Sequence, residues 1–418
     1  MAKPSLNSKF LRLPTSPIRG FPQLKTIPPE RLISLGIGAV NYPAPQEIVK
    51  PLIVYARQAL KTANLYGSSQ GDQELRQALV YWYYKKYKIK ALQPTSFLIG
   101  SGSSELIPWV MEALLPPGSE VLIPEPYYAY YSNFATALGI SLVPIPTSIK
   151  TGFSLPAISK LKASTAKAKK IRAILLTSPN NPTGSVISKS YLTQLVQLAK
   201  EKNWWIIEDS AYSELYYQKH GPVSILSLPA ARERTVVLSS VSKNLALAGW
   251  RVGWVVSLAQ SAIDAMVSRK AEIRGCASVP VQRAVSHLNQ VPVSYFNGLR
   301  RELKARRNSL FLGLKKMASL GVIVSPQPPV GALYIVVRLP FPAEAFVRWC
   351  LSGMDGKSGF LAKHQKTVFC VPMVTKTGSF FISLGDPNLV RLSFGGSHEQ
   401  IKQAIPILRQ AIKEYQSL

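Results

Sequence analysis

The sequence predicts an α/β protein: a large domain with a mostly parallel sheet covered by helices on both faces, plus a smaller α+β domain built from both chain ends. Three observations support this fold class. Short apolar runs alternate with helical patterns between residues 97 and 240, and repeated strand–helix–strand order is typical of a parallel sheet between two layers of helices. The run at 171–177 (IRAILLT) is apolar except for Arg172, as in strands buried on both faces. The pattern changes after about residue 290, where a long helical stretch begins.

Each element of the large domain has its own signal. Apolar runs predict strands at 97–100, within 116–124, and at 171–177, 204–207 and 235–238. Helical patterns occupy 103–115 and 127–138, and a further helix runs to about Lys202. Ser188 is suited to cap that helix, because its hydroxyl can accept a hydrogen bond from a free backbone N–H of the first turn. The residues between 238 and Lys243 are expected to form a loop.

The small domain is predicted from a different mixture of elements. A helix is expected over 294–320, a strand within 331–337, a helix near 343–351, strands near Thr367 and Val390, and a C-terminal helix from Ser397. We expect 46–290 to form the large domain and 291–418 the small C-terminal domain, with residues 1–45 as an N-terminal arm and part of the small domain.

Composition excludes several classes of protein. The chain has 418 residues, of which 47% are hydrophobic and 17% charged, which is a globular composition. Three cysteines and four scattered histidines give no disulfide framework, zinc spacing or histidine-based triad. We see neither an apolar run of about 18 residues, as a membrane span needs, nor a signal peptide. The expectation is a cytoplasmic protein without a metal.

The net charge is +29, from 50 basic and 21 acidic residues. Such an excess is evidence about partners and not about fold. The basic residues are spread along the chain, and the densest run, at 160–172, has no nucleic-acid-binding signature beside it. We therefore expect no specific nucleic acid and no membrane among the partners.

Polar residues follow three of the predicted strands. The strand at 171–177 leads into SPNNPTG, the next is followed by Asp209 and Tyr212, and the third by Lys243 and Arg251. In open α/β sheets, ligands bind at the carboxyl ends of the strands. Taken singly, each signal is weak: Asn-Pro-Thr-Gly is usually a turn, a strand-end aspartate is often a helix cap, and a lone lysine is usually on the surface.

Together these motifs resemble the class I pyridoxal-phosphate (PLP)-dependent aminotransferases of the aspartate aminotransferase type, fold type I. The order is NNPTG, then Asp209-x-Ala-Tyr212, then Ser240-x-Ser-Lys243, with Arg251 eight positions later. The resemblance covers nearly the whole chain. It runs through SPIRGF (16–21), LGIGAVNYPAP (35–45), Y-x-x-x-x-G (66–71), SGSSEL (101–106), PEPYYAYY (124–131) and LVRLSFG (389–395).

The resemblance implies an enzyme that moves the amino group of an L-amino acid to a 2-oxo acid by a ping-pong mechanism, with 46–290 as the PLP-binding domain. Lys243 would form the Schiff base and then carry a proton, which suits a lysine because its pKa falls readily on burial. Asp209 would keep the pyridine nitrogen of the cofactor protonated. Asn181 and Tyr212 would donate to its phenolate oxygen, and Lys243, Asp209 and Tyr212 form the implied catalytic set.

Further residues are implied to hold the cofactor and the substrate. Tyr128 would stack on the ring, with Tyr127 as the competing register. Arg391 would bind the substrate carboxylate, for which arginine is well suited, with help from Asn181 and the backbone at Gly38. The residues implied for the phosphate are Gly102, Ser103, Ser104, Ser240, Arg251 and, from the neighbouring subunit of a homodimer with shared active sites, Tyr66.

The chain departs from the family pattern at several points. The segment VPMVTKTGSFF (371–381), which would cover the substrate, has Met373 where a glycine is often found, and Asn41 stands in place of an acid. The motifs identify no residue that would bind a second, side-chain carboxylate of the substrate. Arg274 and Arg283 are the two arginines that could take this role. The aromatic residues that could favour a large apolar substrate, or simply pack in the core, are Tyr42, Trp109 and Tyr334.

Four alternatives are weighed. The main alternative is a carbon–sulfur β-lyase or another PLP enzyme of the same fold, because these enzymes share most of the cofactor residues. Ser240-x-x-Lys243 with Y-x-N (295–297) and K-T-G (376–378) follows the order of a penicillin-binding or β-lactamase-like acyltransferase; that mechanism needs a buried helix where we expect a loop. A nucleotide-binding oxidoreductase lacks its third glycine. A nucleic-acid-binding protein on an inactive scaffold is disfavoured by the full set of motif residues.

Overall fold

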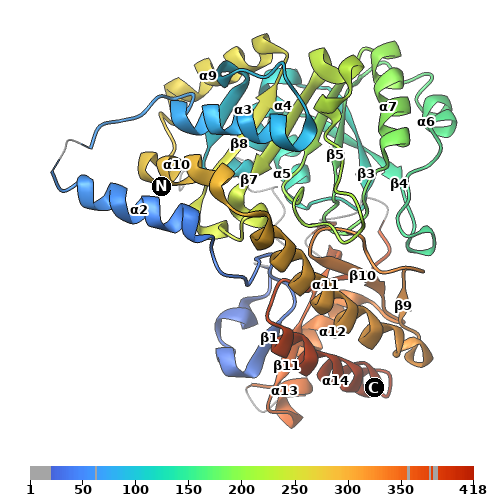
Figure 1. Cartoon of the computed structure of the whole chain (residues 1–418). Helices are drawn as coiled ribbons and strands as arrows, with labels where there is room; N and C mark the ends of the chain where they lie inside the picture. The colour runs from blue at the N-terminus through green and yellow to red at the C-terminus, as the bar shows by residue number, and fades with distance from the viewer. Residues whose placement is uncertain (1–19, 62–63, 355–357, 376–377, 380–384) are drawn as a thin grey trace, which may run out of the picture.

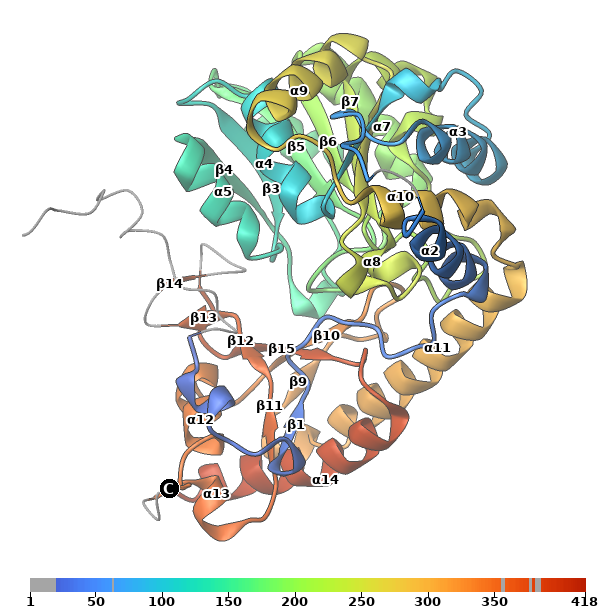
Figure 2. The ribbon, with the colours of Figure 1, turned by 90° about the vertical axis from the view of Figure 1, so that its left-hand side faces the viewer.

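The computed structural model describes residues 20–61, 64–354, 358–375, 378–379 and 385–418. It confirms the predicted α/β class. Two lobes are visible, one around a large sheet and one around a smaller sheet, and helix α11 (Val293–Lys315) runs from one into the other (Figures 1 and 2). The segment SPIRGF and the 371–381 segment lie partly outside the described residues.

The large sheet has the strand order β2-β8-β7-β6-β5-β3-β4. Strands β3 to β7 run parallel to their neighbours within this set, and β8 is antiparallel to both β2 and β7. The carboxyl ends of β5, β6 and β7 therefore meet at one edge of the sheet. The strands are β2 Phe97–Gly100, β3 Glu120–Glu125, β4 Ser141–Pro146, β5 Ile171–Thr177, β6 Trp205–Asp209, β7 Thr235–Ser240 and β8 Gly253–Ser257.

Helices cover both faces of this sheet, because successive residues of a strand point to opposite sides. In β5, Ala173 and Leu175 pack with α4 (Ser103–Leu114), α5 (Tyr130–Leu138) and α9 (Gln260–Ile273). The neighbouring Ile174 and Leu176 pack with α6 (Ile158–Ser164) and α7 (Lys189–Glu201). Each fully buried aliphatic side chain of this kind stabilises the fold by roughly 1.5–3 kcal/mol.

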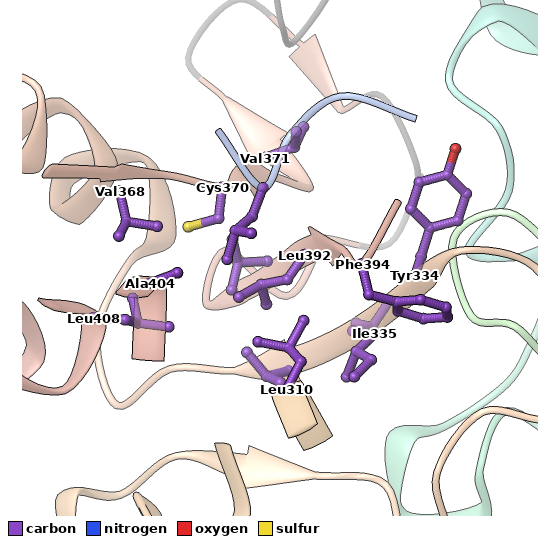
Figure 3. Close-up of a cluster of buried hydrophobic side chains, with 14 of the residues drawn as sticks. Leu310, Tyr334, Ile335, Val368, Cys370, Val371, Leu392, Phe394, Ala404 and Leu408 are labelled. Carbon is purple, nitrogen blue, oxygen red and sulfur yellow. The ribbon is translucent and has the colours of Figure 1, made fainter. Parts of the chain in front are cut away.

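The second lobe contains an antiparallel sheet of order β12-β15-β10-β9. Strand β1 (Leu32–Ser34) pairs in parallel with β11 (Thr367–Phe369), so amino-terminal residues join this lobe. Figure 3 shows its core, where Leu310 of α11 lies next to Leu392 of β15 (Leu389–Ser393), and Leu408 of α14 (His398–Tyr415) lies beside Ala404 of the same helix. We propose the domain limits predicted from the sequence, with the boundary near residue 290 just before α11.

The remaining elements complete the two lobes. They are α2 Gln46–Gln58, α3 Gln73–Tyr87, α8 Val241–Asn244, α10 Val279–Val285, β9 Ile323–Val324, β10 Tyr334–Arg338, α12 Ala343–Cys350, α13 Phe360–Lys363, β12 Val371–Pro372, β13 Val374–Thr375 and β14 Gly378–Ser379. Across the described ranges, no helix has both the length and the apolar character needed to cross a bilayer, and no group of three acidic, histidine or cysteine side chains could hold a metal ion.

Three predicted element limits are corrected by the structure. The helix expected from residue 127 begins at Tyr130, after a turn that contains Tyr127 and Tyr128. The helix expected to reach residue 320 ends at Lys315 and is followed by a short 3-10 turn that Gly321 ends with a positive φ of 77°. The loop expected before Lys243 is one helical turn, closed by the hydrogen bond from Leu245 N to Val241 O at 3.1 Å.

Candidate active site

A cavity of about 300 Å³ lies at the carboxyl ends of β5, β6 and β7. It receives residues from both lobes and from the segment before α2. The predicted site residues that line it are Gly38, Ser103, Ser104, Tyr128, Asn181, Asp209, Tyr212, Ser240, Lys243, Arg251 and Arg391. A larger cavity, of about 550 Å³, lies beside the 183–188 segment and contains none of them.

Lys243 lies on α8, directly after β7, and its ammonium group donates to the carbonyl oxygen of Gly38. Burial, together with the nearby cations Arg391 and Arg251, lowers the pKa of Lys243 from 10.5 to about 8. A partly buried lysine beside other cations is the setting in which an amine becomes neutral and nucleophilic near neutral pH.

Asp209 is the last residue of β6 and is buried. Its Oδ2 accepts a hydrogen bond of 2.6 Å from the Tyr131 hydroxyl, and its Oδ1 accepts one of 3.0 Å from Ala211 N. Burial raises the pKa of Asp209, while these two hydrogen bonds act in the opposite direction. The carboxylate is held in one orientation and faces the cavity, where a cationic group would stabilise its ionised form.

The NNPTG motif forms a turn that presents Asn181 to the cavity. Asn180 Oδ1 accepts from Thr183 N at 3.0 Å and from Thr183 Oγ1 at 2.9 Å, which closes the turn on itself. Gly184 has φ +69°, and a Cβ there would lie 2.7 Å from the carbonyl oxygen of Gly331. The glycine therefore lets the turn pack against the second lobe while Asn181 stays buried in the site.

Arg391 lies on β15 and is only 3% exposed. Its Nη1 donates to Asn181 Oδ1 at 3.1 Å, and its Nη2 donates to the carbonyl oxygen of Gly36 at 2.7 Å. Asn181 Nδ2 in turn donates to the Tyr212 hydroxyl at 3.3 Å. A guanidinium that is fixed in this way can offer a planar pair of donors to a carboxylate.

Gly102 stands between β2 and the first turn of α4, which contains Ser103 and Ser104. It has φ +90°, and a Cβ would lie 2.4 Å from Nη2 of Arg251. That guanidinium donates to Ser101 O at 2.9 Å and to Ala248 O at 3.0 Å. A helix start beside a fixed arginine is an arrangement that suits a phosphate group.

The remaining predicted residues differ in whether they line the cavity. Tyr128 lines the cavity, whereas Tyr127 does not and instead accepts a hydrogen bond from Ser132. Tyr66 is 97% exposed and does not line this chain's cavity. Arg283 pairs with Asp72 and Glu74 outside the cavity.

Of the three aromatic candidates for the substrate pocket, Tyr334 lines the cavity. Tyr42 packs edge-on against Tyr295, and Trp109 of α4 is partly buried and packs against the hydrophobic cluster on one face of the large sheet. Neither lines the cavity, so their positions fit core packing. Arg274 does not line it either.

Sequence reasoning missed several residues that line the cavity, notably Tyr131, Thr177 and Ser242. Tyr131 contacts Asp209, and its hydroxyl lies 3.0 Å from Thr177 Oγ1. A signal was present, because Thr177 ends a strand next to the one that ends at Asp209. Tyr131 also belongs to the same PEPYYAYY motif as Tyr128.

Comparisons with known proteins agree with this geometry. The family model described as aminotransferase class I and II matches residues 30–408. The chain is 30% identical to aromatic-amino-acid aminotransferase 2 of Thermococcus litoralis over 92% of both chains, and 28% identical to the aspartate aminotransferase of Thermotoga maritima over 90% of both. The crystal structure of an aromatic aminotransferase from Pyrococcus horikoshii superposes with a TM-score of 0.78 and 26% identity, over 95% of this chain and 99% of that one. The chain belongs to the class I and II aminotransferase family.

Proposed function

We propose that this aminotransferase uses PLP on Lys243 to move the amino group of an L-amino acid to a 2-oxo acid by a ping-pong mechanism. The observation that carries the proposal is the meeting of three groups in one cavity: an amine with a pKa of about 8, a buried carboxylate and a buried guanidinium, from Lys243, Asp209 and Arg391.

The residues around the cavity fit PLP. The absence of a Cβ at Gly102 leaves room for Arg251 beside the start of α4, which suits the phosphate. Asp209 is a buried acceptor that suits the pyridinium N–H, and Asn181 and Tyr212 bring donors for the ring oxygen. When bound, PLP would supply an electron sink for the charge that develops at the substrate's α-carbon.

The chain's own groups then have separate tasks. Lys243, when neutral, offers a nucleophilic amine and accepts a proton from the substrate's α-carbon. Arg391 and Asn181 orient the α-carboxylate, so that the same face of the α-carbon is presented to Lys243 at each turnover. Asp209, held by Tyr131, keeps a negative charge at the wall of the cavity.

The pKa of Lys243 predicts the pH dependence of cofactor capture. Only the neutral amine attacks the PLP aldehyde, so the rate at which the apo-protein captures PLP should rise about tenfold per pH unit below pH 8 and level off above it. Stopped-flow absorbance of apo-protein mixed with PLP, over a series of buffers, measures this profile. A midpoint near 10.5, the ordinary lysine value, would contradict the prediction.

Gly102→Ala is predicted to lower PLP affinity by roughly 10- to 100-fold, because the new Cβ would collide with Arg251 and displace a charged phosphate partner. Gly118→Ala is the matched control: it has φ +86° and nothing within 4 Å of an ideal Cβ, so it shares the backbone cost without the collision. Equilibrium titration of both apo-proteins with PLP makes the comparison. Equal losses of affinity in the two variants would show that Arg251 is not involved.

We also infer a homodimer in which Tyr66 reaches the phosphate bound by the partner subunit. Tyr66 is 97% exposed, and the side chain of the preceding residue, Leu65, is 80% exposed. Its segment is nevertheless anchored, since Gly67 N donates to Cys276 Sγ at 3.3 Å and Lys270 Nζ donates to Ser69 O at 2.7 Å. An ordered anchor that carries exposed aromatic and aliphatic side chains suits contact with another protein surface.

A visible absorption spectrum with a panel of L-amino acids tests the proposed function. Loss of the visible band of the PLP-loaded protein, with about one equivalent of 2-oxo acid released, is the expected result and also names the substrate. A band that persists while ammonia or carbon dioxide accumulates would indicate a lyase or decarboxylase on this fold. The absence of any band after PLP is added would overturn the proposal.

A further inference from the structure

Tyr334, the first residue of β10, lies where the two lobes meet at the cavity. Its side chain is 2% exposed. Figure 3 shows it at the edge of the hydrophobic cluster of the second lobe, with its hydroxyl pointing away from Ile335 and Leu392. It lines the same cavity as Lys243, so its polar end faces the candidate site while its ring is part of the core.

Four side chains form a closed ring of contacts at this point. Arg391 donates to Asn181, and Asn181 donates to Tyr212. The hydroxyl oxygens of Tyr212 and Tyr334 are 2.9 Å apart. The guanidinium carbon of Arg391 lies 4.3 Å from the centre of the Tyr334 ring. Tyr334 therefore contacts both Tyr212, which we propose binds the cofactor, and Arg391, which we propose binds the substrate.

The donors and acceptors in this ring determine where the Tyr212 proton can go. Arg391 has donors only, so Asn181 must turn its carbonyl oxygen toward Arg391 and its NH₂ toward Tyr212. The Tyr212 oxygen thus already accepts one hydrogen bond. When the Tyr334 hydroxyl donates a second one, the Tyr212 proton is left free to point into the cavity.

We propose that Tyr334 is a positioning residue with two roles. Its hydroxyl donates to Tyr212 and so directs the Tyr212 proton to the phenolate oxygen of the cofactor. The face of its aromatic ring supports Arg391. This inference rests on the proposed PLP function. An arginine over an aromatic face is stabilised by a cation–π interaction, which strengthens when the pair is desolvated. The hydroxyl and the ring of Tyr334 thus serve the two halves of the site separately.

Gly38 provides the space that this arrangement needs. An ideal Cβ at residue 38 would lie 2.1 Å from the Tyr334 hydroxyl oxygen, so any side chain there would push Tyr334 away from Tyr212. The carbonyl of the same residue accepts a hydrogen bond from Lys243. One glycine therefore accommodates both Tyr334 and the reactive lysine.

The buried position of Tyr212 keeps its hydroxyl protonated. Burial is the largest cause that raises the pKa of Tyr212 well above its usual value, against the opposing effect of Arg391. A phenol that keeps its proton can act as a donor throughout the working pH range. The ionisable groups that line the cavity around Tyr212 and Tyr334 are Tyr128, Tyr130, Tyr131, Asp209, Lys243, Arg251 and Arg391.

The test compares Tyr334→Phe with the parent enzyme, both loaded with PLP, in a pH titration of the visible absorption band. A hydrogen bond to the ring oxygen favours the form of the chromophore that has lost its proton. Weakening that bond should therefore raise the pH midpoint, by roughly half to one unit, with little change in KM because the ring remains. Tyr217→Phe is the matched control: Tyr217 is buried, donates to Ala332 O and lies outside the cavity, so its midpoint should equal that of the parent.

Tyr334→Leu separates the two parts of the proposal. It removes the ring as well as the hydroxyl, so it should show the same midpoint shift and, in addition, a roughly tenfold higher KM for amino acid and 2-oxo acid. An unchanged midpoint in Tyr334→Phe, or an equal shift in Tyr217→Phe, would overturn the inference. A parent enzyme without a visible band would overturn the proposed function instead, so the two failures can be told apart.

Discussion

Lys243→Ala is expected to lose more than about 10⁴-fold in kcat while it still binds PLP. Two separate contributions disappear with the amine: the nucleophile that forms the covalent link and the base that moves the proton at the α-carbon. General-base catalysis alone contributes about 10²- to 10⁴-fold, and the loss of covalent catalysis adds to it. The groups that would hold the phosphate, including Ser240 and Arg251, remain in place, so the cofactor should bind non-covalently.

Steady-state kinetics and equilibrium dialysis with PLP measure the two parts. Lys243→Arg is the matched control, because it retains a cation next to Gly38 but its guanidinium is always protonated; it should be as inactive as the alanine variant. Added small primary amines should restore part of the proton transfer in Lys243→Ala, since they can enter the space that the side chain vacates. Full activity of Lys243→Ala would rule out this lysine as the reactive group.

Much of the large domain could be predicted because its strands are buried on both faces. Such strands are nearly continuous apolar runs, so β5 to β7 can be recognised directly in the sequence. The polar residues that end them, such as Asp209, follow from the rule that ligands bind at the carboxyl ends of parallel strands. For this reason most of the predicted site residues line one cavity.

The parts that could not be predicted depend on short elements or on distant pairs. Helix α8 has four residues, hardly more than one turn, which is too short to show a helical period, so Lys243 was expected on a loop. Strand β1 pairs with β11, a pairing between the two ends of the chain that leaves no local signal. The hydrogen bond from Tyr131 to Asp209 depends on the direction in which the start of α5 points its side chains. Tertiary packing sets that direction, so the local sequence does not reveal it.

Arg391→Ala is expected to lower kcat/KM by roughly 10²- to 10⁴-fold for every amino acid that the enzyme accepts. Removing one partner of a buried charge pair costs about 3–5 kcal/mol, because the other charge is left without compensation, and each 1.36 kcal/mol corresponds to a factor of ten. The α-carboxylate is common to all amino-acid substrates, so the loss should not depend on the side chain. Arg391→Lys keeps the charge but not the planar pair of donors, and should lose roughly tenfold.

Arg307→Ala is the matched control for this prediction. Arg307 is a buried arginine of α11 that donates to Pro329 O and lies over the Tyr217 ring, outside the cavity. Its loss should lower the free energy of unfolding without a matching rise in KM.

Arg391→Ala should also shift the midpoint of the pH profile of PLP capture to higher pH, because Arg391 is one of the cations that lower the pKa of Lys243. A loss of kcat/KM without that shift would mean that Arg391 binds substrate but does not act on the lysine, whereas unchanged kinetics would place the carboxylate anchor elsewhere.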